Sequence, residues 1–211
     1  MSVPYFCRYT NLAATIHILR TRSITLLNPA TWDDTNDSYF MSEYKRLKNA
    51  QSVLALCFAE SEESYHHWRV FSNGSDGVRI EFDKEGLLVA LTKDPNVRAE
   101  KVTYRKIEDQ RKLMLGCDEL PFLKRWPYSD EREFRLVYTS SVKAVEYKNY
   151  PIALASVRRI TLSPWMPKAL SDSVKDVLKS IKGCHGLRVF QSTLVANEVW
   201  KGLTERVTTS Q

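Results

Sequence analysis

The 211-residue sequence has few cysteines and few glycines, and it lacks the short motifs that mark common metal and phosphate sites. No HExxH motif and no Cys/His quartet occurs, so we expect no bound metal. Gly74 and Gly77 are spaced too sparsely to form a phosphate-binding loop. The cysteines form no CxxC pair and lie far apart, which favours reduced thiols over a disulfide framework: Cys7, Cys57, Cys117 and Cys184.

Long hydrophobic runs and targeting signals are also missing. No apolar run approaches the length of a membrane span, and the N-terminus carries no signal-peptide pattern. We therefore expect no membrane association and a cytoplasmic location. No Pro/Gly/Ser-rich linker and no internal repeat divides the chain, so we predict a single domain over residues 1–203. The last residues, 204–211, are polar and are predicted to form a disordered tail.

What the sequence does contain is enough apolar material for a core, together with an excess of positive charge. Hydrophobic residues make up 43% of the chain and charged residues 27%, proportions typical of a globular domain. The formal net charge is +6, which favours anionic partners such as phosphate groups or nucleic acid.

Strand and helix patterns follow one another irregularly, without the repeated strand–helix–strand order of a parallel α/β fold. We therefore predict a single-domain α+β fold of mixed, mainly antiparallel sheets with flanking helices. Strands are expected at residues 4–9, 24–27, 52–58, 78–82, 97–104, 131–139, 142–147, 158–162 and 187–190. Helices are expected at residues 12–20, 38–49, 65–71, 106–120 and 166–181, the first of them capped by Asn11.

The most informative stretch is the predicted strand over residues 131–139. Side chains two residues apart in a strand share a face, so Glu131, Glu133 and Arg135 project together. Two carboxylates at this spacing repel each other unless a cation or a hydrogen bond compensates them, and Arg135 is the obvious cation. The pattern has two interpretations. It is either a solvent-facing stripe of ion pairs or a pair of carboxylates at the mouth of a site.

Two other segments permit both a structural and a functional interpretation. The loop over residues 31–37 holds three acids and Trp32. It is either a solvated turn that caps the next helix or the rim of a pocket. Tyr65, Trp68 and Phe71 offer aromatic faces on one helical stretch, although aromatics at this spacing usually belong to the core.

Six motifs occur in order between residues 5 and 195. They are Arg8-Tyr9-Thr10, Asn28-Pro29 with its acidic loop, Cys57-Phe58-Ala59 leading to His67-Trp68, Gly77-Val78 through Phe82-Asp83, Glu131-Arg132-Glu133-Phe134-Arg135, and Ile160-Thr161-Leu162-Ser163-Pro164. In this order the motifs resemble a bacterial family known as domain-of-unknown-function family 2971. Thr35 stands where that family usually has proline, and Ser163 where it usually has glycine. The family's name implies no activity.

A second resemblance concerns an Arg-aromatic-Thr strand, a central strand followed by an aromatic helix, and a late Glu-x-Glu strand. This order is similar to that of the ADP-ribosyltransferase superfamily, and it implies a cleft between two small sheets that binds NAD as a substrate. The resemblance makes Glu133 the catalytic carboxylate and Glu131 the carboxylate on the acceptor side. It assigns NAD binding to Arg8, Tyr9, Ser61, Tyr65, Trp68 and Arg135.

The resemblance also implies a reaction. Breaking the nicotinamide–ribose bond builds positive charge on C1′, which a carboxylate stabilises while cationic groups neutralise the pyrophosphate. The implied function is transfer of ADP-ribose to a nucleic acid or protein acceptor, or NAD hydrolysis, as in a bacterial toxin or a phage-defence effector. An antitoxin or immunity protein is then an implied partner.

Two functions without NAD chemistry stay open. A metal-dependent nuclease would use grouped carboxylates, either Asp76, Glu81 and Asp83 or Glu131 and Glu133. A non-catalytic module would bind DNA, RNA or an acidic protein through a basic face made of paired cations. The pairs are Lys45-Arg46, Arg105-Lys106, Arg111-Lys112, Lys124-Arg125 and Arg158-Arg159.

Overall fold

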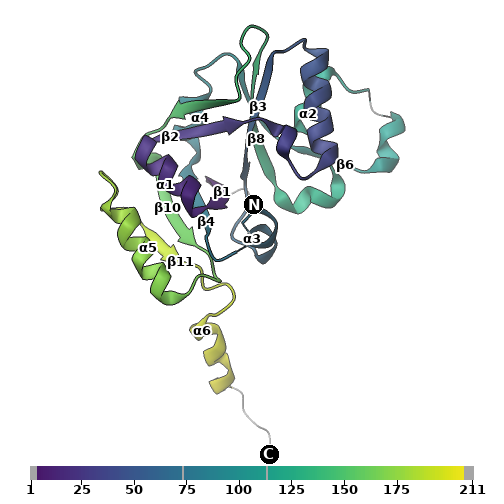
Figure 1. The fold of residues 1–211 in the computed structure, drawn as a ribbon. Coiled ribbons are helices and arrows are strands. Elements are labelled where there is room, and N and C mark those ends of the chain that lie inside the picture. The colour runs from purple at the N-terminus through teal and green to yellow at the C-terminus, as the bar shows by residue number, and fades with distance from the viewer. Residues whose placement is uncertain (1–3, 73, 113, 207–211) are drawn as a thin grey trace, which may run out of the picture.

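A computed structural model gives the arrangement of residues 4–72, 74–112 and 114–206 (Figure 1). The strands are β1 (Tyr5–Asn11), β2 (Ser23–Leu27), β3 (Ser52–Ala59), β4 (Gly77–Asp83), β5 (Val97–Lys101), β6 (Thr103–Arg105), β7 (Leu123–Arg125), β8 (Glu133–Ser140), β9 (Tyr147–Pro151), β10 (Val157–Leu162) and β11 (Val189–Gln191). The α-helices are α1 (Leu12–Thr21), α2 (Thr35–Leu47), α3 (Tyr65–Phe71), α4 (Lys84–Leu91), α5 (Lys168–Ser180) and α6 (Glu198–Lys201). The 3-10 helices are η1 (Pro29–Thr31), η2 (Ile107–Lys112), η3 (Cys117–Phe122), η4 (Trp126–Glu131), η5 (Leu154–Ser156) and η6 (Gly202–Arg206).

The described strands form one large sheet and one small one. The large sheet has the order β11-β10-β4-β1-β3-β2-β9, and β8 joins it by pairing with β3 on one side and β5 on the other. Its strand pairs are antiparallel except for β10 with β11. The small sheet is the parallel pair of β6 and β7. These pairings confirm the predicted α+β class with mainly antiparallel sheets.

The large sheet divides at β3. β3 pairs with β8 along its whole length, but it meets β1 at one residue pair, Cys7 with Ala59. It likewise meets β2 at one pair, Leu27 with Ala55. The ladders on either side therefore diverge from a narrow junction, which is the split arrangement that the sequence implied. A backbone that opens in this way leaves room for a cavity beside the junction.

The two faces of the large sheet are covered differently. One face carries the main core, into which α1, α4 and α5 each bury leucines. The opposite face has two separate apolar clusters, one around α2 with Met41 and Tyr44, the other around α3 with Trp68. In Figure 1 these two helices lie apart on either side of the central strands. The part of the sheet between them is free for polar side chains.

Strand β8 shows how the sequence produces the two faces. Phe134 and Leu136 point into the main core, while Glu133 and Arg135 take the opposite face between the α2 and α3 clusters. Side chains alternate across a strand, so one hydrophobic and one charged set can share a single segment. Glu133 and Arg135 therefore share one face of the strand, as their spacing predicts.

Most predicted elements occur near their expected positions, and the exceptions have local causes. The predicted helix over residues 106–120 is wrong, since that part of the chain contains the 3-10 helices η2 and η3 around Gly116. Among the described residues of this segment, Ile107 and Met114 are exposed, so they provide no buried stripe to hold a helix. The strand predicted at residues 142–147 is also displaced. It begins only at Tyr147, and Val142 is exposed.

Other predictions differ at their boundaries. Helix α1 is capped by Asn11 as expected, through a hydrogen bond from the Ala14 amide to Asn11 Oδ1. Helix α2 begins at Thr35 instead of residue 38, because Asp34 caps it. Helix α4 was not predicted. It starts where Asp83 Oδ2 accepts a hydrogen bond from the Gly86 amide.

The predicted tail over residues 204–211 lies only partly within the described residues. Residues up to Arg206 belong to η6, and residues 207–211 lie outside the described part. The division into one domain and a tail stays a prediction. All four cysteines are free thiols. Among the described helices, none combines the length and apolar character that a membrane span requires.

Candidate functional site

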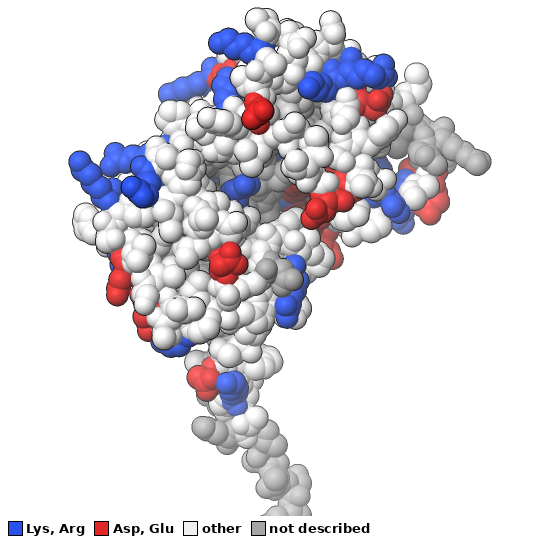
Figure 2. Space-filling view, viewed as in Figure 1, with Lys and Arg blue, Asp and Glu red and all other residues white. Residues whose placement is uncertain are grey.

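A cavity of about 540 Å³ lies on the polar face of the sheet, between the apolar clusters of α2 and α3. The face seen in Figure 2 is hollowed near its centre, with basic and acidic side chains close together there. The walls of the cavity come from β1, β3, β8, η1 with the loop after it, α2, α3, β7 and η4. The lining residues are Cys7, Arg8, Tyr9, Thr31, Trp32, Asp33, Asp34, Asp37, Cys57, Phe58, Ala59, Val70, Phe71, Lys124, Tyr128, Glu131, Glu133 and Arg135.

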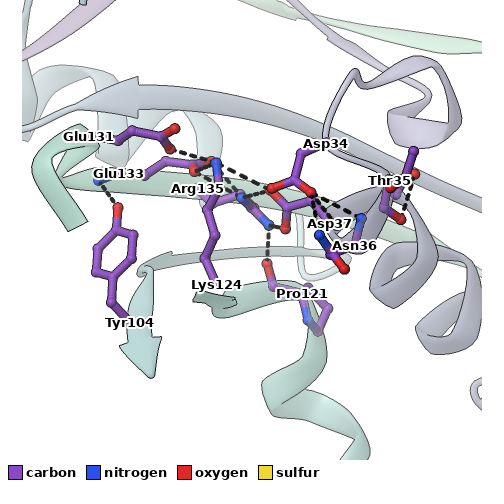
Figure 3. Close-up of polar contacts among 11 residues, drawn as sticks. Asp34, Thr35, Asn36, Asp37, Tyr104, Pro121, Lys124, Glu131, Glu133 and Arg135 are labelled. Carbon is purple, nitrogen blue, oxygen red and sulfur yellow. Dashed lines mark hydrogen bonds and ion pairs between the residues drawn. The ribbon is translucent and has the colours of Figure 1, made fainter. Parts of the chain in front are cut away.

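Five charged side chains meet in the wall of this cavity, and we call them the carboxylate cluster: Asp37, Lys124, Glu131, Glu133 and Arg135 (Figure 3). Each is at least nine-tenths buried as a side chain. The cluster sets three carboxylates against two cations, a formal net charge of −1. The predicted proximity of Glu131, Glu133 and Arg135 is therefore found, and it faces a cavity instead of open solvent.

Arg135 is the centre of this cluster. Its Nε and Nη2 donate to the two carboxylate oxygens of Glu133, at 2.8 and 2.9 Å. Its Nη1 and Nη2 donate to the two oxygens of Asp37, at 3.1 and 2.9 Å, and Nη1 also donates to the carbonyl of Pro121. Trp32 covers the guanidinium, whose central carbon lies 4.8 Å from the ring centroid. Two bidentate ion pairs with one guanidinium fix both carboxylates in orientation.

Lys124 reaches the same carboxylates from β7. Its Nζ donates to Glu131 Oε2 at 2.5 Å and lies 3.4 Å from Glu133 Oε2 and 3.5 Å from Asp37 Oδ2. The ammonium group thus occupies the point where three carboxylates converge. Tyr128 lies beside it, with the ring centroid 4.8 Å from Nζ.

The local backbone places Glu131 differently from the prediction. Glu131 ends η4 instead of lying in β8, and Arg132 between the two glutamates adopts a left-handed conformation with φ 44° and ψ 51°. The Arg132 amide donates to the Ser129 carbonyl, and its own carbonyl accepts from the Glu60 amide at the end of β3. This turn brings Glu131 and Glu133 into one cavity even though only one of them belongs to the strand.

Backbone and aromatic contacts hold the two glutamates in place. The Glu133 amide donates to the Tyr104 hydroxyl at 2.8 Å. The Glu131 carbonyl lies 3.3 Å from Nε2 of His67, a buried ring that also contacts the hydroxyls of Ser61 and Ser64. Burial lowers the pKa of His67, so the ring is neutral near pH 7.

The environments of the two glutamates shift their pKa values in opposite directions. Burial alone would raise the pKa of Glu133, but the guanidinium of Arg135 and the ammonium of Lys124 outweigh it and lower that pKa to about 2. Burial raises the pKa of Glu131, and the negative charge of Glu133 acts in the same direction. A pair of carboxyl groups separated in this way divides the roles of fixed anion and proton acceptor.

The same geometry bears on the metal-dependent alternative. Lys124 supplies the positive charge at the point where a cation bridging Glu131 and Glu133 would lie. Of the other acids considered, Glu81 pairs with Arg79 and Asp83 caps α4. Within residues 4–72, 74–112 and 114–206, no group of three His, Cys, Asp or Glu side chains is arranged to hold a metal ion.

Arg8 lies in the cavity wall at the junction where β1 and β3 diverge. Its Nη1 donates to the Cys57 carbonyl at 3.2 Å, a carbonyl beside the point where the β1–β3 pairing ends. Within the described part of the chain, Arg8 forms no ion pair. Burial lowers the pKa of Arg8, which indicates a guanidinium with little solvent around it. An uncompensated cation in a cavity wall favours an anionic ligand group beside it.

The other residues assigned from the resemblance are distributed unevenly. Tyr9 lies in the cavity wall, as predicted. Trp68 does not, because it is fully buried and donates its indole N–H to Glu63, so neither face is free to stack on nicotinamide. Ser61 is buried against His67. Tyr65 is half exposed beside Trp165, outside the cavity. The structure therefore places Trp68, Ser61 and Tyr65 outside the wall of the cavity that holds Arg8, Tyr9 and Arg135.

Sequence reasoning did not assign Asp37, Lys124 or Trp32 to the site. The sequence leaves the acidic loop open between a helix-capping turn and a pocket rim, and the structure shows both: Asp34 caps α2, and Trp32 and Asp34 line the cavity. Lys124 belonged to a basic pair with no visible link to the glutamates. The sequence offers one signal for such a residue. Glu131 and Glu133 are like charges two residues apart, so a cation from another part of the chain is needed to compensate them.

Comparisons with known proteins give one kind of match. No protein-family model and no curated protein matches the chain. The resemblance to domain-of-unknown-function family 2971 therefore stays a prediction. Among solved structures, the chain is similar to DarT from Thermus sp. 2.9 in complex with ADP-ribosylated ssDNA, at 12% identity and a TM-score of 0.46, covering 91% of this chain and 98% of that one.

Two further DarT structures from the same organism also match. The one in complex with NAD+ gives 12% identity and a TM-score of 0.44, and the one in complex with carba-NAD+ gives 14% and 0.43. Each covers 90% of this chain and 95% of the other.

Proposed function

We propose that the cavity binds NAD and that the protein cleaves the nicotinamide–ribose bond, transferring ADP-ribose to a macromolecular acceptor or to water. The observation that carries this proposal is Glu133, a buried carboxylate in a cavity wall whose pKa Arg135 and Lys124 lower to about 2. A carboxylate held ionised and immobile is suited to stabilise positive charge as it develops on a sugar carbon.

The electrostatics of the cavity support this reaction. When the bond breaks, nicotinamide leaves with the bonding electron pair and C1′ of the ribose gains oxocarbenium-like character. Nicotinamide is cationic in NAD and leaves neutral, so the positive charge moves from its ring nitrogen to the ribose as the bond breaks. A carboxylate held beside C1′, in a cluster whose formal net charge is −1, stabilises the charge at its new position. Because the charges are fixed before the reaction, little reorganisation is needed at the transition state.

Arg8 is the proposed partner of the NAD pyrophosphate. It lies in the wall of the same cavity as Glu133, and the only hydrogen bond recorded for its guanidinium within the described chain goes to the Cys57 carbonyl. The remaining N–H groups are free to donate to phosphate oxygens. The cavity volume of about 540 Å³ lies within the range of small-molecule and cofactor sites.

Glu131 is the proposed group on the acceptor side. Burial raises its pKa, which makes it a better proton acceptor than Glu133 at neutral pH. In the transfer step, the acceptor's nucleophilic oxygen or nitrogen forms a bond to C1′, and its proton passes to Glu131. Lys124, which donates to Glu131 Oε2, keeps the carboxylate oriented. The toxin or phage-defence role and the antitoxin partner rest on the resemblance alone and stay predictions.

Replacement of Glu133 tests the proposal. Glu133→Gln keeps the shape of the side chain and removes the charge, so NAD turnover should fall on the order of 10³-fold. Nicotinamide release from NAD, with and without DNA, RNA or protein acceptors, measures this. The control is Glu146→Gln, which removes an exposed carboxylate and should leave turnover unchanged.

The test of Glu133→Gln needs a folding control, and two outcomes would contradict the proposal. Circular dichroism and thermal unfolding of Glu133→Gln establish that the variant is folded before its activity is compared. Equal turnover by Glu133→Gln and the unmodified protein contradicts the role of Glu133. Absence of nicotinamide release and of NAD binding by the unmodified protein contradicts the proposed function as a whole.

A further inference from the structure

A second polar surface lies on the same face of the sheet, across β1 from the cavity. We call it the arginine–aromatic patch: Tyr5, Arg158, Arg159, Arg188 and Phe190. Phe190 is 47% exposed, and the guanidinium carbons of Arg159 and Arg188 lie 5.6 and 5.8 Å from its ring centroid. Arg158 lies 5.6 Å from the ring of Tyr5. The patch thus alternates aromatic rings with guanidinium groups along the strands β1, β10 and β11.

The patch has more positive charge than its surroundings compensate. Within the described part of the chain, neither Arg158 nor Arg188 forms an ion pair. Arg159 lies 3.2 Å from Glu81 Oε1, but Glu81 is shared with the buried Arg79. Asp83, opposite Tyr5 on β4, uses its carboxylate to cap α4.

Buried donors beneath the patch also lack acceptors. Thr161 on β10 lies opposite Phe190 on β11 and opposite Arg79 on β4, so all three share a sheet face. Among the described residues, the Thr161 hydroxyl and the Arg79 Nε–H have no hydrogen-bond partner, although both side chains are at least nine-tenths buried. A buried donor without a partner requires an acceptor, which water or a ligand group can supply.

We propose that the arginine–aromatic patch binds single-stranded nucleic acid. The further step, that this nucleic acid is the acceptor of ADP-ribose, rests on the proposed function. Guanidinium groups contact phosphates, the exposed ring of Phe190 stacks on a base, and the partly buried Tyr5 contributes the edge of the surface. Flat aromatic faces interleaved with cations fit unpaired bases, whereas an acidic polypeptide would need the cations alone.

The position of the patch relative to the cavity fits an acceptor strand. Cys7 lines the cavity on β1, Glu81 lies opposite it on β4, and Arg159 lies opposite Glu81 on β10. Two interstrand spacings separate Arg159 from Cys7, a distance of about 10 Å. A strand bound across the patch therefore lies close enough to present a neighbouring nucleotide at the cavity.

Oligonucleotide binding by variants of the patch tests this inference. The probes are fluorescein-labelled single-stranded DNA and RNA, and the readout is fluorescence anisotropy from 30 to 300 mM salt, a range of about one decade. Arg158→Gln/Arg188→Gln should weaken binding about tenfold or more and reduce the salt slope by about 1.4. Phe190→Ala should weaken it about tenfold with the slope unchanged.

The matched control removes two charges from the other face. Lys179→Gln/Lys182→Gln alters exposed lysines at and beyond the C-terminal end of α5 and should change affinity less than about twofold. An equal loss in this control, or undiminished binding by Phe190→Ala, overturns the inference in favour of non-specific attraction. Equal binding of poly-glutamate overturns it in favour of an acidic protein partner.

The two proposals fail separately. Arg158→Gln/Arg188→Gln should keep its nicotinamide release in the absence of acceptor, because the patch lies outside the cavity. Oligonucleotide binding that the patch variants abolish, in a protein that does not cleave NAD, supports the patch and contradicts the NAD proposal. NAD cleavage without any oligonucleotide binding supports the NAD proposal and contradicts the proposed role of the patch.

Discussion

Two groups of buried charge occupy the same sheet face and have opposite balances. The carboxylate cluster holds three carboxylates and two cations, while an arginine group of Arg79, Glu81 and Arg159 holds one carboxylate and two cations. Each contains an arginine that is only 1% exposed, Arg135 in the first and Arg79 in the second. The two groups therefore differ in sign, while the arginine at the centre of each is equally buried.

The register of the sheet connects the two groups. Glu133 lies opposite Ala59, Ala59 opposite Cys7, Cys7 opposite Glu81, and Glu81 opposite Arg159. One row of paired residues thus runs from a negative end on β8 to a positive end on β10. A substrate that becomes cationic at one end and is anionic at the other is aligned by such a gradient. The position of a ligand group along this row therefore determines whether it lies beside carboxylates or beside guanidinium groups.

The largest effect should come from removing the central arginine of each group. Arg135→Met leaves three carboxylates with Lys124 as their cation and should cost about 3–5 kcal/mol of unfolding free energy. Arg79→Met leaves Glu81 paired with Arg159, so the cost should be lower, about 1–3 kcal/mol. Urea unfolding monitored by tryptophan fluorescence measures both.

Measuring both variants tests whether charge balance or burial determines how much each arginine contributes to stability. Equal costs for Arg135→Met and Arg79→Met show that burial alone, and not charge balance, determines the contribution of each arginine. A smaller cost at Arg135 contradicts its position as the centre of the carboxylate cluster.

A smaller effect is expected from Arg8, which lies between the two groups on β1. Arg8→Gln should raise the KM for NAD on the order of 10- to 100-fold, from about 1.5–3 kcal/mol of charge-assisted hydrogen bonding, while kcat changes less. Steady-state nicotinamide release measures both constants. Arg20→Gln, an exposed arginine on α1, is the control and should change neither constant. A fall in kcat with KM unchanged assigns Arg8 to the chemical step instead.

The smallest effect concerns the two glutamates and pH. Glu133 has a pKa lowered from 4.5 to about 2, so its stabilisation is present above pH 4.5 and is lost as pH falls through about 2. Glu131 has a raised pKa, so its ionisation costs stability as pH rises through that value. At pH 7, Glu131→Gln should match or exceed the unmodified protein by about 1 kcal/mol, and Glu133→Gln should be less stable.

Urea unfolding from pH 3 to pH 8 checks this opposition. The deficit of Glu133→Gln should shrink toward pH 3, and the gain of Glu131→Gln should vanish below pH 4.5. Parallel curves for the two variants contradict the division of roles between the glutamates.

Site residues that are neighbours in one strand can be predicted from the sequence more readily than contacts between distant segments. Glu133 and Arg135 follow from strand alternation, and Phe134 and Leu136 identify the buried face by the same rule. Asp37 pairs with Arg135 across 98 positions, and nothing in the local pattern of either segment indicates that contact. Lys124 is close in sequence, but the turn through η4 that returns it to Glu131 depends on tertiary packing.

The same distinction explains the errors in the fold. Short-range signals were sufficient for β3, α1 and α3, where an apolar run or a cap marks the element. Residues 106–120 contain helix-forming residues, but among those described only Cys117 and Leu120 pack against an apolar cluster, and the segment forms 3-10 turns. The resemblance assigns Trp68 to NAD binding, whereas the aromatic spacing of its helix favours a core position, and in the structure Trp68 is fully buried in an apolar cluster.

The left-handed residue between the two glutamates determines what may vary there. Arg132 contributes its backbone angles to the site, and it also lines a second depression beside Glu60 and Tyr104. Glycine, asparagine and aspartate adopt φ near 44° readily, whereas valine and isoleucine do not. Position 132 should therefore accept side chains of different charge and size, provided that the residue can adopt a left-handed backbone conformation. The recognisable signature of such a site is an acid, a turn-forming residue and a second acid, in place of two acids separated by any residue.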